Sequence, residues 1–216
     1  MGILYAMPKV SPEYRRARRD EIAAAALRCL ERDGVAGTSI ADIVAESGLS
    51  AGAIYSHFTN KAEIARYLGR EFLIVKLDQL EAEAAAGLAL SPREVITQML
   101  TIAHRDGVPA VVVLQFWTEA QVDDELRPTF LATVEDLRAS LQAILLPWAR
   151  TVAVVPDGDS DTDSTGKPDH EAAAQRRASE AAASVLAVAQ GYILHVALFG
   201  PREPGDYLAS ISAALS

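Results

Sequence analysis

Side chains that can bind phosphate are concentrated between residues 38 and 61 of this 216-residue chain. Hydroxyl and N–H groups donate hydrogen bonds to phosphate oxygens, and a lysine adds positive charge. The segment supplies such groups, together with small residues that leave room for a ligand: Ser39, Ser50, Ala51, Gly52, Tyr55, Ser56, His57 and Lys61. Their types and spacing predict a surface that binds a phosphate backbone.

The same segment contains a motif that could suggest catalysis. Residues 48–52, GLSAG, match the G-x-S-x-G nucleophile elbow of hydrolases. That elbow requires a β-strand before the serine and a helix after it. Because the preceding residues, IADIVAES, place their apolar side chains at helical spacing, we expect no strand there. The sequence therefore does not predict an enzyme, and no motif requires a cofactor or a metal.

Two short helices joined by a tight turn must position the phosphate-binding residues. Ser39 can cap the first helix, with Asp42 in the reciprocal position of a capping box. Gly48 ends that helix, and Ser50 caps a second one that buries Ile54 and Phe58. Small residues at the start of the second helix allow its backbone N–H groups to approach a phosphate closely.

Longer helices flank this pair. Residues 12–33 place an apolar stripe on one face, which includes the single cysteine, Cys29, and Gly34 should end the helix in a left-handed conformation. A further helix should open at Asn60 and continue to residue 86. The start of the first helix is basic, because only Glu13 balances the positive charges before Asp20: Lys9, Arg15, Arg16, Arg18 and Arg19.

Together these features resemble the helix-turn-helix of the TetR family of transcriptional regulators. A sequence like AIYSHFTNKAEI closes the recognition helix and opens the next helix in that family, and residues 13–75 carry the whole pattern in order. The resemblance implies that seven residues lie against DNA: Ser39, Ser50, Ala51, Gly52, Tyr55, His57 and Lys61. The basic cluster adds Arg15, Arg16 and Arg19, and Ser56 joins them as a possible phosphate ligand.

One feature departs from direct base recognition. Ala51, Gly52 and Ala53 offer almost no side-chain donors or acceptors to base edges. Sequence preference would then depend on thymine methyl contacts, backbone contacts, the first helix of the pair or DNA shape.

The net charge of −9 first argues against a nucleic-acid partner. Its distribution changes that conclusion, because residues 1–72 contain ten Lys and Arg against nine Asp and Glu, whereas residues 73–216 contain ten against twenty. An acidic body repelled by phosphate would restrict DNA contact to the N-terminal residues.

The rest of the chain predicts an all-α protein. Alanine is abundant, and helix signals mark residues 91–106, 108–121, 124–152 and 170–199, with a short helix after Pro204. Residues 156–169 are polar and rich in turn formers, so we expect a mobile acidic loop. Its alternating aspartates do not fit a calcium-binding EF-hand in any register.

The predicted organisation is a flexible arm at residues 1–11, a DNA-binding domain at 12–59 and a larger domain at 60–216, which begins with a connecting helix at 60–86. The resemblance implies that the larger domain binds a small-molecule effector and forms a homodimer on double-stranded operator DNA, most simply as a repressor of a palindromic site. Effector contacts are expected among aromatic and polar residues on apolar helices: His104, Gln115, Phe116, Trp117, Trp148, Tyr192 and His195. Dimer contacts are expected on the last long helix, where an intramolecular core is the competing interpretation: Leu186, Ala187, Gly191, Ile193 and Leu194.

Cysteine content and hydropathy bear on localisation. A single cysteine excludes an intramolecular disulfide framework, and the first six residues are too short for a signal peptide, with Met7 as an alternative start. Residues 181–200 carry no charge and approach the length of a membrane span, but Ser184, Gln190 and His195 interrupt them. We therefore expect a cytoplasmic protein in which this helix lies in a soluble interface.

Overall fold

The computed structural model describes residues 11–69, 75–106, 108–152 and 170–214. These residues form helices and no strand, which confirms the all-α fold class. They divide into two compact units, Met1–Tyr67 and Leu68–Ser216. The division falls inside a helix, later than the boundary expected at residue 59. The expected arm at residues 1–11 lies, apart from Ser11, outside the described residues, as does the acidic loop at 156–169.

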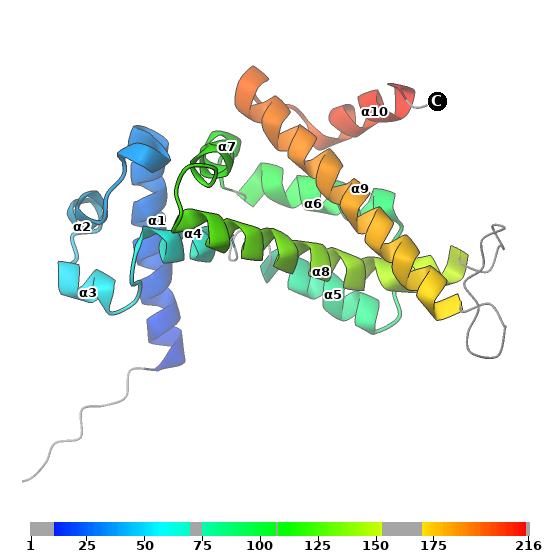
Figure 1. The fold of residues 1–216 in the computed structure, drawn as a ribbon, viewed down its shortest axis with the longest axis horizontal. Helices are drawn as coiled ribbons and strands as arrows, with labels where there is room; N and C mark the ends of the chain where they lie inside the picture. Colours follow the sequence, from blue (N-terminus) through cyan, green and yellow to red (C-terminus); the bar gives the residue numbers. More distant parts are fainter. Residues whose placement is uncertain (1–10, 70–74, 107, 153–169, 215–216) are drawn as a thin grey trace, which may run out of the picture. The chain divides into compact units, whose positions relative to one another are not determined.

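The first unit begins with helix α1 (Pro12–Gly37), whose start and end are set by local signals (Figure 1). The Ser11 hydroxyl accepts a hydrogen bond from the N–H of Tyr14 at 3.2 Å, as an N-cap does. Gly34 interrupts the helix with φ 76° and ψ 172°, a conformation open only to glycine, and one more turn follows. The predicted break is confirmed, although Gly34 adopts an extended ψ in place of a left-handed cap. The apolar stripe of α1, including Cys29, is fully buried.

Helices α2 (Ile40–Ser47) and α3 (Ala51–Tyr55) form the predicted pair. The Ser39 Oγ accepts from Asp42 N at 3.3 Å, and Asp42 Oδ2 accepts from Ser39 N at 2.8 Å, so the capping box is present. Gly48 ends α2 in the left-handed region, with φ 68° and ψ 8°. Ser50 then caps α3. Because helices lie on both sides of the GLSAG motif, it lacks the strand that a nucleophile elbow needs.

Helix α4 (Lys61–Gly69) begins at the predicted cap, since Asn60 Oδ1 accepts from Glu63 N at 2.9 Å. The Glu63 carboxylate accepts from the N–H of Thr59, one residue earlier than a standard capping box. Helix α5 (Val75–Ala85) follows in the second unit. The continuous helix expected from residue 60 to 86 includes residues outside the described part of the chain.

The second unit is built around two long helices, α8 (Leu126–Val152) and α9 (His170–Phe199), which pack against each other. Leucine and isoleucine side chains of α8 meet alanines of α9, such as Ala174 and Ala178, and these small residues allow the helices to approach closely. Helix α5 covers α8, and α6 (Pro92–Asp106) and α7 (Ala110–Glu119) cover α9, while α10 (Pro204–Ala214) lies beside α6 (Figure 1).

Capping explains where these helices begin. Ser91 and Glu94 form the predicted capping box of α6, with Ser91 N donating to Glu94 Oε2 at 2.8 Å. Helix α7 starts two residues later than expected, because the extended backbone of Pro109 precedes it. Helix α8 starts at Leu126 because Asp123 Oδ1 accepts the N–H groups of Glu125 and Leu126, each at 2.9 Å.

Helix α9 is long and apolar enough, by length and composition, to cross a membrane. In the structure it packs on α6, α7 and α8 through one face, with Ala182, Val185, Ala189 and Tyr192 buried. This packing is that of a core helix in a helical domain.

Candidate nucleic-acid interface

The start of α3 and the cap of α2 present the exposed part of the predicted interface. Ser39, Ser50, Ala51 and Gly52 are exposed, and 56% of Tyr55 is accessible to solvent. The Ser50 hydroxyl accepts from Ala53 N at 3.2 Å, so it orients the first turn of α3. The neighbouring hydroxyl of Ser56 is also exposed, but it donates to the carbonyl of Ala53 at 2.7 Å.

His57 lies half-buried where α3 ends, close to the positive charges of α1. Burial lowers the pKa of its imidazole, and the charges of Arg19, Arg18 and Arg15 lower it further. Arg15 is exposed, and Arg18 donates to Tyr14 Oη at 2.9 Å and to Glu21 at 2.6 Å. The first turns of α1 and the end of α3 therefore form one basic region, to which the exposed Arg16 is adjacent in sequence.

Arg19 points into the first unit. Its guanidinium carbon lies 4.4 Å from the ring centre of Phe58 and 4.7 Å from that of Tyr67. Its Nη2 atom lies 3.4 Å from the carboxylate of Glu63. Arg19 is thus held by aromatic rings and an acid of its own chain.

Lys61 also binds inside the first unit. Its ammonium group donates to the carbonyl oxygens of Val35 at 2.8 Å and Thr38 at 3.3 Å. These carbonyls lie where α1 gives way to α2, so the lysine caps this junction and fastens it to the first residue of α4. The ammonium group of Lys61 therefore has hydrogen-bond partners inside the first unit, and its contact with DNA stays a prediction.

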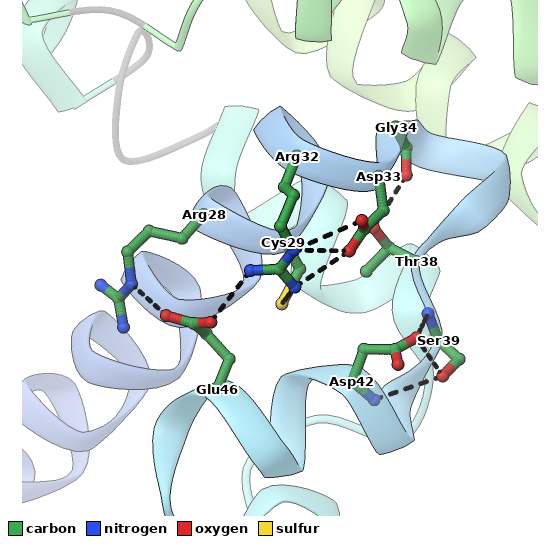
Figure 2. A network of polar contacts seen from close by, with 9 residues as sticks. All are labelled: Arg28, Cys29, Arg32, Asp33, Gly34, Thr38, Ser39, Asp42 and Glu46. Carbon is green, nitrogen blue, oxygen red and sulfur yellow. Dashed lines mark hydrogen bonds and ion pairs between the residues drawn. The ribbon is translucent and has the colours of Figure 1, made fainter.

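A network of ion pairs that the sequence reasoning missed joins α1 to α2 (Figure 2). The Glu46 carboxylate accepts from Arg28 Nε at 2.6 Å and from Arg32 Nη1 at 3.1 Å. Arg32 also pairs with Asp33 at 2.9 Å, and its guanidinium lies 3.7 Å from the Cys29 sulfur. The two arginines lower the pKa of Glu46, and burial raises the pKa of the Cys29 thiol. The spacing of Arg28 and Arg32, one helical turn apart, was the available signal.

The predicted effector residues are only partly brought together in the second unit. Tyr192 Oη donates to the carbonyl of Arg202 at 2.7 Å and lies 3.0 Å from His104 Nδ1, which must then be the donor. His195 is linked to this pair through the ring of Tyr207. Burial, followed by the charge of Glu203, raises the pKa of Tyr192.

The other predicted effector residues lie on different helices. Gln115, Phe116 and Trp117 are half-buried on α7, whereas Trp148 packs from α8 against the core. The structure therefore connects His104, Tyr192 and His195, and the set as a whole remains a prediction.

The predicted dimer residues divide between the two faces of α9. A Cβ atom on Gly191 would lie 2.6 Å from Tyr207 Oη, so α10 of the same chain occupies that position. Leu186 packs against the core, and Ile193 is half-buried. Ala187 is exposed and Leu194 is 44% exposed. Only these last two present an open surface to a second copy.

Residues 22–68 match the family model described as bacterial regulatory proteins, tetR family. The N-terminal unit belongs to the TetR family. The match includes α2, α3 and most of α4, together with the buried part of α1. It therefore covers the predicted interface from Ser39 to Lys61, while Arg15, Arg16 and Arg19 precede it.

Two curated relatives support this TetR assignment. The chain is 30% identical over 109 residues to an uncharacterized HTH-type transcriptional regulator, YfiR, of Bacillus subtilis, covering 50% of this chain and 53% of the relative. It is 42% identical over 62 residues to the HTH-type transcriptional regulator TtgR of Pseudomonas putida, covering 29% and 30%. The first match spans about half of the relative's length, and the second spans under a third.

A solved structure shares the fold of most of this chain. A TetR transcription regulator from Haloarcula marismortui shares 18% identity, with a TM-score of 0.58 over 92% of this chain and 96% of that one. At this identity the likeness concerns the fold alone. It agrees with a helical second unit following a TetR-family DNA-binding unit.

Proposed function

We propose that this protein is a DNA-binding transcriptional regulator, and more specifically a homodimeric repressor of a palindromic operator. The observation that carries the proposal is the exposed face of α2 and α3 beside the basic start of α1. Ser39, Ser50, Gly52 and Tyr55 are open to solvent there. Exposed hydroxyl groups and closely approachable backbone are what phosphate contacts require.

Charge distribution supports the same partner. Residues 73–216 carry twice as many acids as bases, so phosphate would repel the second unit. The positive charges of α1 act on His57 at the end of α3. They therefore lie near α3, which is the helix that we propose enters the DNA groove. DNA contact should therefore be confined to the first unit.

The test is the salt dependence of DNA affinity, measured by fluorescence anisotropy with the full chain and a duplex that it selects from a random-sequence pool. The logarithm of the affinity should fall linearly with the logarithm of salt concentration. Arg15→Met should make that slope shallower by about 0.9, because one phosphate contact is lost. Arg138→Met on α8, which removes an exposed arginine paired with Glu135, should leave the slope unchanged.

Failure to select any duplex, or binding without salt dependence, would refute the proposed function. Equal slopes for Arg15→Met and the wild type would instead refute the placement of the basic start of α1 against DNA.

Regulation by a small-molecule effector is the second part of the proposal. The polar and aromatic side chains around Tyr192 join α6, α9 and α10, so a ligand there would change the packing of three helices at once. A compound that raises the melting temperature of the full chain should weaken binding to the selected duplex. Stabilisation with unchanged or tighter DNA binding would contradict release by effector.

A further inference from the structure

The strongest further observation concerns Arg19, which the sequence grouped with the phosphate-binding arginines. Its guanidinium carbon lies over two aromatic rings, those of Phe58 and Tyr67, at 4.4 Å and 4.7 Å from their centres. The two rings are themselves in edge-to-face contact, with centres 5.5 Å apart. Both distances to the guanidinium are within the range of a favourable cation–π interaction.

The polar atoms of Arg19 are directed toward its own chain. Nη2 lies 3.4 Å from Glu63 Oε1, and Nε is buried without a hydrogen-bond partner among the described residues. The Glu63 carboxylate is also bound by the N–H of Thr59 at 2.8 Å. A phosphate would have to compete with Glu63 and with both rings for this side chain.

The residues that contact Arg19 come from two parts of the first unit, the segment after α3 and the helix α4. Phe58 is 1% exposed and follows the recognition helix α3 by three residues, whereas Glu63 and Tyr67 belong to α4. The next residue of α1, Asp20, accepts a hydrogen bond from Tyr67 Oη at 2.5 Å. Two consecutive residues of α1, Arg19 and Asp20, therefore connect α1 to the segment after α3 and to α4.

We propose that Arg19 is a positioning residue, which sets the orientation of the recognition helix through its stack with Phe58 and Tyr67 and makes no contact with phosphate. This inference rests on the proposed DNA-binding function. A planar guanidinium can stack on aromatic rings, which a compact lysine ammonium cannot do in the same way. Arg19→Lys, which keeps the positive charge but loses the planar group, should therefore not preserve the orientation of the recognition helix.

Two quantities distinguish positioning from contact: the slope of affinity against salt, and the ratio of affinities for the selected duplex and a scrambled duplex. Loss of a phosphate contact makes the slope shallower by about 0.9. Misorientation of the recognition helix weakens base recognition, so it lowers the affinity ratio. Partial unfolding reduces active protein for both duplexes equally and leaves the ratio unchanged.

The experiment compares Arg19→Met, Arg19→Lys and the contact variant Arg15→Met in the full chain. Both Arg19 variants should keep the wild-type slope and lose about threefold to tenfold of the affinity ratio. Arg15→Met should lower the slope and keep the ratio. Tyr67→Phe, which removes the bond to Asp20 and retains the ring, should also lower the ratio at an unchanged slope.

A shallower slope for Arg19→Met, restored by Arg19→Lys, would overturn the inference and make Arg19 a phosphate contact. An unchanged affinity ratio in Arg19→Lys and Tyr67→Phe would overturn it as well. Absence of salt-dependent binding by the wild type would instead reject the proposed function, so the two failures are separable. Circular dichroism melting of each variant fixes the folded fraction used in the affinities.

Discussion

The imidazole of His57 lies in a field that favours its neutral form. Burial and the charges of Arg19, Arg18 and Arg15 on α1 all lower its pKa below the ordinary 6.5. Glu63 pairs with Arg19 and so reduces one of these charges. A DNA phosphate placed beside this group would raise the pKa of His57, because a nearby negative charge favours the protonated imidazole.

Proton uptake should therefore accompany DNA binding. In free protein the pKa of His57 is low, and in the complex the phosphate raises it, so a proton is bound in the pH range between the two values. Affinity should increase as pH falls through the raised pKa of the complex and level off below the lowered pKa of the free protein, by at most about tenfold per pH unit for one proton. Anisotropy titrations at constant ionic strength measure this.

His57→Gln should flatten the pH profile, whereas His104→Gln, in the second unit, should retain it. If His57→Gln kept the wild-type dependence, another group would be the one that takes up the proton.

Arg19 and Lys61 show what the sequence could not predict at the residue scale. Their types and positions fit phosphate binding, but Arg19 reaches Glu63, 44 residues away, and Lys61 reaches Val35, 26 residues away. Such contacts depend on how helices pack in three dimensions. Capping by Ser39, Ser50 and Ser91 was predictable because each partner lies three residues along the chain.

At the scale of helices, the turn between α2 and α3 sets the exposed face of the pair. Gly48 occupies it with φ 68°, and a Cβ atom built there would meet nothing within 4 Å. A side chain at Gly48 is thus disfavoured by backbone conformation alone. Gly52, by contrast, lies in α3 with φ in the ordinary range, and a Cβ atom there would be 4.0 Å from Ser50 Oγ.

Gly48→Ala should destabilise the α2–α3 pair by about 1 kcal/mol, because non-glycine residues pay a steric cost in the left-handed region. Gly48→Asn should cost less, since asparagine tolerates that region. Gly52→Ala is the matched control and should not lower stability. Hydrogen–deuterium exchange of the α2 and α3 amides measures the difference. Equal losses for Gly48→Ala and Gly52→Ala would contradict a conformational origin.

At the scale of the molecule, α9 separates two surfaces. One surface faces the core and contains Val185, Ala189 and Tyr192. The other is exposed and contains residues at helical spacing: Ala187, Gln190, Leu194 and Leu198. Leu198 is 59% exposed and the adjacent Phe199 is 76% exposed. Ala187, Leu194 and Leu198 on this exposed surface are apolar, whereas Gln190 is polar. Exposed apolar side chains gathered on one face favour a protein interface, which the proposed homodimer would bury. Gly191 is excluded from it, because Tyr207 of α10 covers that position.

Leu194→Glu should therefore convert the proposed dimer to a monomer, because it places a charge in the centre of the proposed interface. We expect the dimer dissociation constant, measured by sedimentation velocity, to rise at least about 100-fold. Leu88→Glu provides a matched control, since Leu88 is 46% exposed and Leu194 is 44% exposed, and Leu88 lies between α5 and α6. Its dissociation constant should not change.

Loss of the dimer should abolish tight binding to a palindromic duplex and leave binding to a single half-site intact, because the recognition helices are in the other unit. A Leu194→Glu protein that remained dimeric would move the interface away from this face of α9.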